Sequence, residues 1–165
     1  MRRQIITPAV AGVLLALAGT AQADQKTTSF EVSANVKKNC IITAGELAFG
    51  DWTVETDTES TSTITVRCTN GTTFAVNLDA GQHASGDISQ RQMDGPGSVN
   101  VRYNLYTDAD LVWGNGTTGD NDGGTGAGMG SPQNLTVTGK LAVADNEGAI
   151  EPGLYTDTVT ATVEY

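Results

Sequence analysis

The sequence is poor in the residues that carry most enzyme chemistry. Its 165 residues include two cysteines and a single histidine, His83. No Cys-x-x-Cys pair is present for redox or metal chemistry, and no serine lies in a Gly-x-Ser-x-Gly elbow. A nucleophilic enzyme needs its serine or cysteine beside a base. We therefore expect a protein that is not an enzyme and that uses no cofactor and no resident metal.

Basic residues are also scarce. The chain has 9 Lys and Arg against 19 Asp and Glu, and its formal net charge is −10. Two of the nine basic residues, Arg2 and Arg3, stand at the N-terminus. Polyanions such as nucleic acid and anionic membrane surfaces attract basic proteins, so we expect neither as a partner.

The sequence lacks a long hydrophobic run. The apolar stretch Ala9–Gly19 has about eleven residues, whereas a membrane span needs about 20. It follows Arg2 and Arg3 and precedes the small-residue site Ala21-Gln22-Ala23. This order is typical of a secretory signal peptide. We expect cleavage after Ala23, no membrane insertion, and export of residues 24–165, a length that suits one domain.

The two cysteines, Cys40 and Cys68, are the natural partners for a disulfide. An even pair in a small exported domain favours a structural bridge, because exported proteins fold under oxidising conditions. The bridge would close a loop of about 28 residues and stabilise the fold by about 3–4 kcal/mol on the chain-entropy model. Metal or redox chemistry is the alternative, and the lone histidine speaks against it.

The chain is rich in alternating apolar and polar residues. This period of two indicates strands with one buried face. It is clearest over 158–165, where one face carries Val159, Ala161, Val163 and Tyr165 and the other carries Thr and Glu. Similar alternation predicts strands near 30–37, 63–68, 74–78, 99–105 and 135–141. In the last of these we expect Gly139 to mark a bulge.

Turn signals separate these strands. Asn70-Gly71 predicts a hairpin between 63–68 and 74–78. The glycine-rich stretches 80–98 and 114–132 are expected to be surface loops. No stretch after residue 23 carries the 3.6-residue apolar stripe of a helix. The pattern of about seven short strands predicts an all-β antiparallel sandwich.

One acidic loop invites a metal hypothesis. Asp120-Asn121-Asp122-Gly123 resembles half of a calcium loop, but no glutamate follows in the window and the flanking helices are missing. A solvated acidic loop is the preferred interpretation. An isolated calcium site is the alternative.

Several motifs, in order, resemble those of the spore coat protein U domain, which is also the subunit domain of archaic chaperone–usher pili. They extend over nearly all of the exported chain, and their order and spacing are more specific than any one of them. The motifs are Asn39-Cys40-Ile41, Leu47-Ala48-Phe49-Gly50-Asp51-Trp52, Ile64–Thr69, Val76–Gly81, Arg91-Gln92-Met93, Tyr103–Asp108, Trp113-Gly114-Asn115-Gly116 and Gly153–Thr160.

The resemblance implies an incomplete immunoglobulin-like sandwich that lacks its last strand. A periplasmic chaperone would supply the strand first, and the N-terminal extension of the next subunit would replace it at an outer-membrane usher. Here residues 24–38 would be the extension and 39–165 the domain. The candidate donor side chains are Phe30, Val32, Ala34 and Val36. Alternatively, these four belong to the domain's own first strand. The strand 158–165 would border the groove and pair with the chaperone.

The function implied by the resemblance is that of a structural subunit of a surface pilus, most simply a homopolymer, which supports adhesion and biofilm formation. The length leaves room for one domain, which favours a shaft subunit over a two-domain tip adhesin. Two alternatives stay open. One is a protective coat protein of a spore or cell surface, and the other is a secreted module that binds sugar or calcium.

Overall fold

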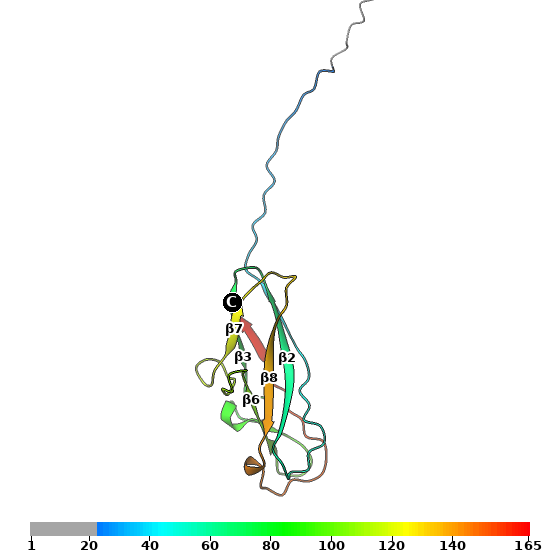
Figure 1. Cartoon of the computed structure of the whole chain (residues 1–165), viewed down its shortest axis with the longest axis vertical. Coiled ribbons are helices and arrows are strands. Elements are labelled where there is room, and N and C mark those ends of the chain that lie inside the picture. Colours follow the sequence, from blue (N-terminus) through cyan, green and yellow to red (C-terminus); the bar gives the residue numbers. More distant parts are fainter. Residues whose placement is uncertain (1–22) are drawn as a thin grey trace, which may run out of the picture. The chain divides into compact units, whose positions relative to one another are not determined.

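A computed structural model describes residues 23–165, so the expected signal peptide lies outside the described residues except for Ala23. The chain divides into two units, Met1–Asn35 and Val36–Tyr165. Residues 23–39 form no strand or helix and are exposed, and Figure 1 draws them as a thread. Within residues 23–165 no helix has the length and apolarity to cross a membrane.

The first sheet has four strands in the order β1-β2-β8-β6: β1 (Cys40–Ala44), β2 (Thr58–Cys68), β8 (Gln133–Leu141) and β6 (Asn104–Tyr106). All its pairs are antiparallel, and β2 and β8 run side by side in Figure 1. Cys40 lies opposite Cys68 and is bonded to it, which confirms the predicted disulfide.

The expected bulge at Gly139 is wrong. The register between β2 and β8 is continuous, and Gly139 pairs with Ser60. Glycine is needed here because another segment packs closely over the strand. A Cβ atom on Gly139 would lie 2.8 Å from Cδ2 of Leu47 and 2.9 Å from Cζ of Phe49.

The second sheet has the order β7-β3-β9: β7 (Asp122–Thr125), β3 (Thr73–Leu78) and β9 (Ala161–Glu164). The predicted hairpin at Asn70-Gly71 is therefore wrong, since β2 and β3 lie in different sheets. The turn carries the chain from one layer to the other. It is held by Gly126, whose carbonyl accepts the Gly71 N–H at 2.8 Å and whose N–H donates to Thr72 at 2.7 Å.

The expectation of a surface loop over 114–132 is wrong in part, because β7 lies within it. Glycine makes this strand possible. A Cβ atom on Gly123 would clash with the carbonyl oxygen of Phe74 in the neighbouring strand, and one on Gly126 would clash with Thr69. The glycine-rich sequence thus lets a bare backbone approach β3 and the end of β2.

The remaining elements are short: β4 (Gln92–Met93), β5 (Val101–Arg102), and the 3₁₀ turns η1 (Ile88–Gln90) and η2 (Val143–Asp145). The strand predicted over 99–105 is divided at Tyr103, whose N–H donates to the carbonyl of Arg91. The terminal strand is also shorter than predicted. It ends at Glu164, and the Tyr165 side chain is 55% exposed.

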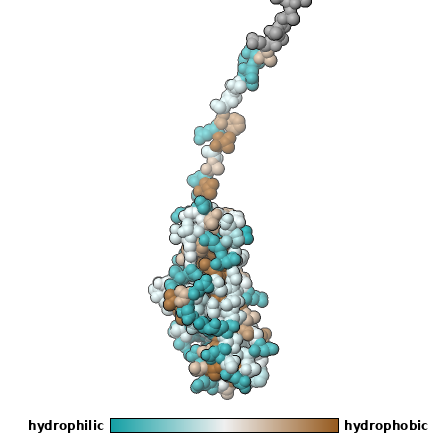
Figure 2. Space-filling model, viewed as in Figure 1, coloured by the Kyte–Doolittle hydropathy of each residue, from teal (hydrophilic) through white to brown (hydrophobic). Residues whose placement is uncertain are grey.

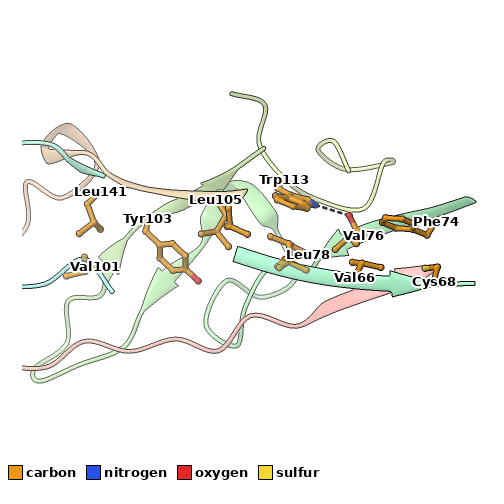
Figure 3. Close-up of a cluster of buried hydrophobic side chains, with 12 residues drawn as sticks. Val66, Cys68, Phe74, Val76, Leu78, Val101, Tyr103, Leu105, Trp113 and Leu141 are labelled. Carbon is orange, nitrogen blue, oxygen red and sulfur yellow. Dashed lines mark hydrogen bonds between the residues drawn. The ribbon is translucent and has the colours of Figure 1, made fainter. Parts of the chain in front are cut away.

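The core lies between the two sheets. β2 contributes Val66 and β3 contributes Val76, and both are fully buried. Trp113 is also fully buried, and its indole Nε1–H donates to the carbonyl oxygen of Val76 at 2.8 Å (Figure 3). A buried indole N–H needs such a partner, because an unpaired polar group in the core is costly. The all-β antiparallel fold is confirmed.

Candidate functional site: an open apolar groove

The domain has an open groove of about 1260 Å³. Its floor is made by core side chains of both sheets, among them Ile64, Leu78, Leu105, Val137 and Leu141. Its two walls are irregular segments, which we call the front wall (residues 45–54) and the back wall (residues 150–160). The groove is therefore an unfilled part of the core.

The front wall follows β1 along the edge of β2, and serine hydroxyls hold it there. Ser62 Oγ donates to the carbonyl of Gly45 at 2.8 Å, and Ser60 Oγ donates to that of Ala48 at 2.6 Å. The apolar side chains of this wall, Leu47, Phe49 and Trp52, are only partly buried, and they pack against the core. A second layer on that side is missing.

The back wall changes its strand partner along its length. At one end Thr156 and Asp94 exchange both backbone hydrogen bonds at 2.9 Å. Four residues later Thr160 accepts from the N–H of Asp79, and β9 then pairs with β3. The chain between Thr156 and Thr160 must leave one strand and join another.

Two carboxylates fix this transition. Asp157, whose side chain is 3% exposed, accepts from the Tyr103 hydroxyl at 2.6 Å and from the N–H groups of Gln82 and Thr158. Asp79 accepts from the N–H groups of Thr160 and Gly81. Burial raises the pKa of Asp79, but the hydrogen bonds from Thr160 and Gly81 outweigh it, so the net shift is downward.

The pKa of Tyr103 moves upward. Burial is the main cause, followed by the hydrogen bond and negative charge of Asp157. Both effects disfavour a tyrosinate, so this hydroxyl stays protonated and remains a donor.

A buried cation lies near these carboxylates, of which Asp157 is buried and Asp79 is exposed. Arg91 is 1% exposed and donates to the carbonyls of Asp79 and Trp113 and to Oδ1 of Asn104, the last two at 2.8 Å. Burial lowers the pKa of Arg91, while Tyr103 and the two carboxylates oppose that shift. One guanidinium thus fastens the end of β3 to β6 of the other sheet and to the segment around Trp113.

The edge of the sheet at the back wall has no partner strand within the described residues. In an antiparallel pair, alternate residues point their N–H and C=O groups to opposite sides. Thr160 points toward β3, so Thr162 does too, and Val159, Ala161 and Val163 point away from it. The side chains of these three residues are half-buried against the core. Within the described residues, the sheet therefore ends in an open strand edge whose half-buried side chains face the core.

The predicted edge residues are brought together, with one exception. Val159 and Ala161 line the groove, and Val163 continues their row. Tyr165 lies beyond β9 and is more than half exposed, so it does not extend the buried face as expected.

The candidate donor side chains lie in none of the described strands. Phe30 is 85% exposed, Val32 and Val36 are each 82% exposed, and Ala34 is exposed as well. Figure 2 shows hydrophobic residues alternating with hydrophilic ones along this extension.

Sequence reasoning missed the groove's other wall. Leu47, Phe49 and Trp52 alternate loosely, which was a usable signal for a strand-like apolar face. Asp157 and Arg91 lie within the motifs Gly153–Thr160 and Arg91-Gln92-Met93, but the motifs did not reveal their contacts, because most of their partners are far away in the sequence.

The acidic loop uses its carboxylates locally. Oδ1 of Asp120 accepts the N–H of Asn121, and Oδ1 of Asp122, within β7, accepts that of Gly123. In residues 23–165 no group of three or more His, Cys, Asp or Glu side chains is placed to hold a metal ion.

Comparison with solved structures finds the same fold in a pilus assembly complex. A chain of the chaperone–tip adhesion subunit pre-assembly complex from archaic chaperone–usher Csu pili of Acinetobacter baumannii superposes with a TM-score of 0.56 at 24% identity. The match covers 79% of this chain and 40% of that chain, so the present chain spans less than half of its length. No curated protein matches the sequence.

Comparison with protein families gives a match over most of the sequence. The family described as Spore Coat Protein U domain matches residues 26–162. The match contains both walls of the groove, its floor and the disulfide. The chain belongs to the Spore Coat Protein U domain family.

Proposed function

We propose that this chain is a structural, non-catalytic subunit of a surface pilus and that its groove receives a β-strand from a partner. The unpaired edge at Val159, Ala161 and Val163, beside an apolar groove whose floor is the protein's own core, carries the proposal. An added strand would satisfy the backbone groups and bury the half-exposed side chains together. The family and the fold likeness to a chain of a pilus complex support it.

The donor in the assembled pilus is residues 24–38 of a neighbouring copy. Phe30 to Val36 spans about 20 Å as a strand, and the edge from Tyr155 to Val163 spans about 26 Å, so the four alternating side chains fit along it. The alternative is that these residues serve the domain's own first strand. The first strand of the domain, β1, begins at Cys40, after residues 24–38, which favours donation to another copy.

The donor runs antiparallel to the back wall. Each extension joins its own domain at Cys40, at the end of the groove near the disulfide. The opposite end is formed by residues 50–54 and 150–154. Antiparallel insertion places the donor's domain beyond that opposite end, so that copies stack head to tail. Parallel insertion would crowd it against the acceptor's own extension.

Before a neighbouring subunit binds, another strand must pair with the same edge. A periplasmic chaperone that lends a strand would prevent edge-to-edge aggregation, and an outer-membrane usher would exchange it for the donor. The chain then passes through the periplasm to a homopolymer on the cell surface, where it supports adhesion and biofilm formation.

The first test places a charge in the donor. Val32→Asp puts a carboxylate in the middle of the apolar row, where burial costs several kcal/mol. The variant should form a soluble chaperone complex but no heat-labile ladder of polymers on gels. Ser33→Asp, one residue along on the other face, is the matched control and should polymerise. Equal polymerisation of both variants would exclude residues 24–38 as the donor. If the Val32→Asp protein is degraded before it forms a chaperone complex, the segment instead belongs to the domain's own first strand.

The second test completes the fold within one chain. A second copy of residues 30–38, which begins at the first donor side chain, is appended after Tyr165 through a linker of either about four or about twelve residues. An antiparallel donor forms a hairpin with β9, for which the short linker suffices. A parallel donor must first run back about 26 Å, which needs about eight residues. We expect a stable monomer with one cooperative melt from the short linker, whereas the unextended chain should self-associate. If neither linker gives a stable monomer, the proposal is contradicted. If only the long linker does, the donor strand runs parallel to the back wall.

A protective coat is the second candidate, favoured by the family's name. The same strand donation could build it. Electron microscopy of cells with and without the gene separates the two, since a pilus gives thin fibres and a coat gives a continuous layer.

A further inference from the structure

Two acidic side chains stand on opposite walls at one end of the groove. Asp51 belongs to the front wall and Glu151 to the back wall, and both line the groove and are exposed. Among residues 23–165 the ion pairs involve other acids, namely Asp157, Glu59 and Asp110. The end of the groove away from the disulfide therefore carries two carboxylates without a cationic partner.

Two lysines follow the apolar row of the extension. Lys37 and Lys38 come directly after Val36, and both are exposed. A donor's final position in a groove has to be set by something besides its evenly spaced apolar side chains, because a slip of two residues keeps the same face inward.

The strand register brings the two pairs of charges together. In an antiparallel pair, side chains that face the same way lie opposite one another. All four donor side chains fit on the edge from Tyr155 to Val163 only if Phe30 lies opposite Ala161 or Val163. Counting along the strands, Lys37 and Lys38 then lie opposite residues 153–156, two to five residues from Glu151 on the same wall. Parallel insertion would instead bring them to the acceptor's own lysines, at the end of the groove that carries Glu46 and Glu164.

We propose that Lys37 and Lys38 of the incoming copy contact Asp51 and Glu151 of the receiving copy, and that this contact guides the donor and sets its register. The inference rests on the proposed function. Exposed ion pairs add little to equilibrium stability but raise association rates in a salt-dependent way. The contact therefore acts on the rate and accuracy of subunit addition, and the apolar row supplies the final strength.

The test measures polymer growth of the chain without its signal peptide by light scattering, after refolding with the disulfide intact. Lys37→Glu/Lys38→Glu and Asp51→Lys/Glu151→Lys should each slow growth about fivefold or more at about 20 mM salt. A variant with all four reversals should recover, because the charges again attract. At about 500 mM salt all variants should grow at one rate. Asp108→Lys, an exposed acid that does not line the groove, is the control and should grow like the unchanged chain.

Two results would overturn the inference: either double variant growing at the unchanged rate in low salt, or the four-residue reversal failing to recover. Val32→Asp in the same assay separates this from failure of the proposed function. If Val32→Asp still grows, strand donation itself is wrong. If it stops growth while the charge variants behave like the unchanged chain, strand donation stands and the charge contact is wrong.

Discussion

The hydroxyl of Tyr103 donates to Oδ2 of Asp157 over 2.6 Å and so joins the floor of the groove to its back wall. Oδ1 of the same carboxylate takes the N–H groups of Gln82 and Thr158. One buried side chain thereby sets the point where the C-terminal segment leaves Asp94 and turns toward β3. The shape of the edge at Val159, Ala161 and Val163 depends on this carboxylate, which also lines the groove.

Removing the Tyr103 hydroxyl should destabilise the back wall. Tyr103→Phe keeps the ring but leaves a buried carboxylate with one hydrogen bond fewer, which costs about 1–3 kcal/mol. The loss is measured by urea unfolding of the chain completed with its own appended donor. Tyr106→Phe is the control, because the hydroxyl of Tyr106 makes no hydrogen bond within the described residues, and it should change little. Equal losses in the two variants would contradict this role for Tyr103.

Stability should fall in alkali. The folded state raises the pKa of Tyr103, so above pH of about 10, the ordinary tyrosine value, the unfolded chain loses this proton more readily than the folded one. The stabilising contribution is complete below that pH and declines as pH rises. Urea midpoints between pH of about 8 and 11 measure it. The decline should be shallower in Tyr103→Phe, and identical slopes would contradict the assignment.

The front wall should be sensitive to a single methyl group beneath it. Gly139→Ala places a Cβ within 3 Å of Leu47 and Phe49, which must shift away from β8. We expect about 1–3 kcal/mol of destabilisation and weaker polymerisation. Gly130→Ala, where a Cβ would meet nothing within 4 Å, is the matched control. Unchanged melting of Gly139→Ala would show that the wall is free to move.

The C-terminal residues should differ in importance. Deleting Tyr165 removes a side chain that is 55% exposed and lies beyond β9, so polymerisation should persist. Deleting Val163–Tyr165 also removes the residue opposite Val76 and one of the unpaired edge positions, and fibres should disappear. Immunoblots and electron microscopy compare the two. Normal fibres from the longer deletion would exclude β9 as the receiving edge.

The disulfide should stabilise the pairing of β1 with β2 at one end of the groove. Native material should show a mass two protons lighter than the reduced chain and no thiol that reacts with alkylating agents. Cys40→Ala/Cys68→Ala should lose about 3–4 kcal/mol, because the bond closes a loop over a separation of 28 residues and ties β1 to β2. Reductant should lower the urea midpoint of the unchanged chain and leave that of the double variant where it is. A response of the double variant would point to another cause.

Local alternation was enough to predict the core-facing side chains of β2, β3 and β8. Val66, Val76 and Val137 are buried as their period of two requires. The assignment of strands to sheets was not local. Asn70-Gly71 fits a hairpin or a crossing between layers equally well, and the choice depends on the glycine backbone at Gly126, more than fifty residues away. β7 escaped prediction because two of its four residues are glycine, which gives no apolar pattern.

The sequence predicted the C-terminal edge strand of the candidate site but not the contacts that fix its course. The alternation at the C-terminus indicated an edge strand with one face toward the core, and only Tyr165 departs from that pattern, whereas the strand's role in receiving a partner stays a prediction. The roles of Asp157 and Arg91 arise from contacts between segments brought together by folding, so no pattern in the neighbouring residues could reveal them. The donor role of residues 24–38 stays a prediction, since it concerns a second copy of the chain.

The groove shares its floor with the core, and this has a consequence for the strength of the assembly. Leu78, Leu105 and Val137 support the fold and would also contact a bound strand. Pulling such a strand out would expose the interior of a domain to water, so breaking the link resembles unfolding. Unfolding of small domains takes up to days at room temperature. A fibre built through this groove could therefore bear load for long periods with no covalent bond between its members.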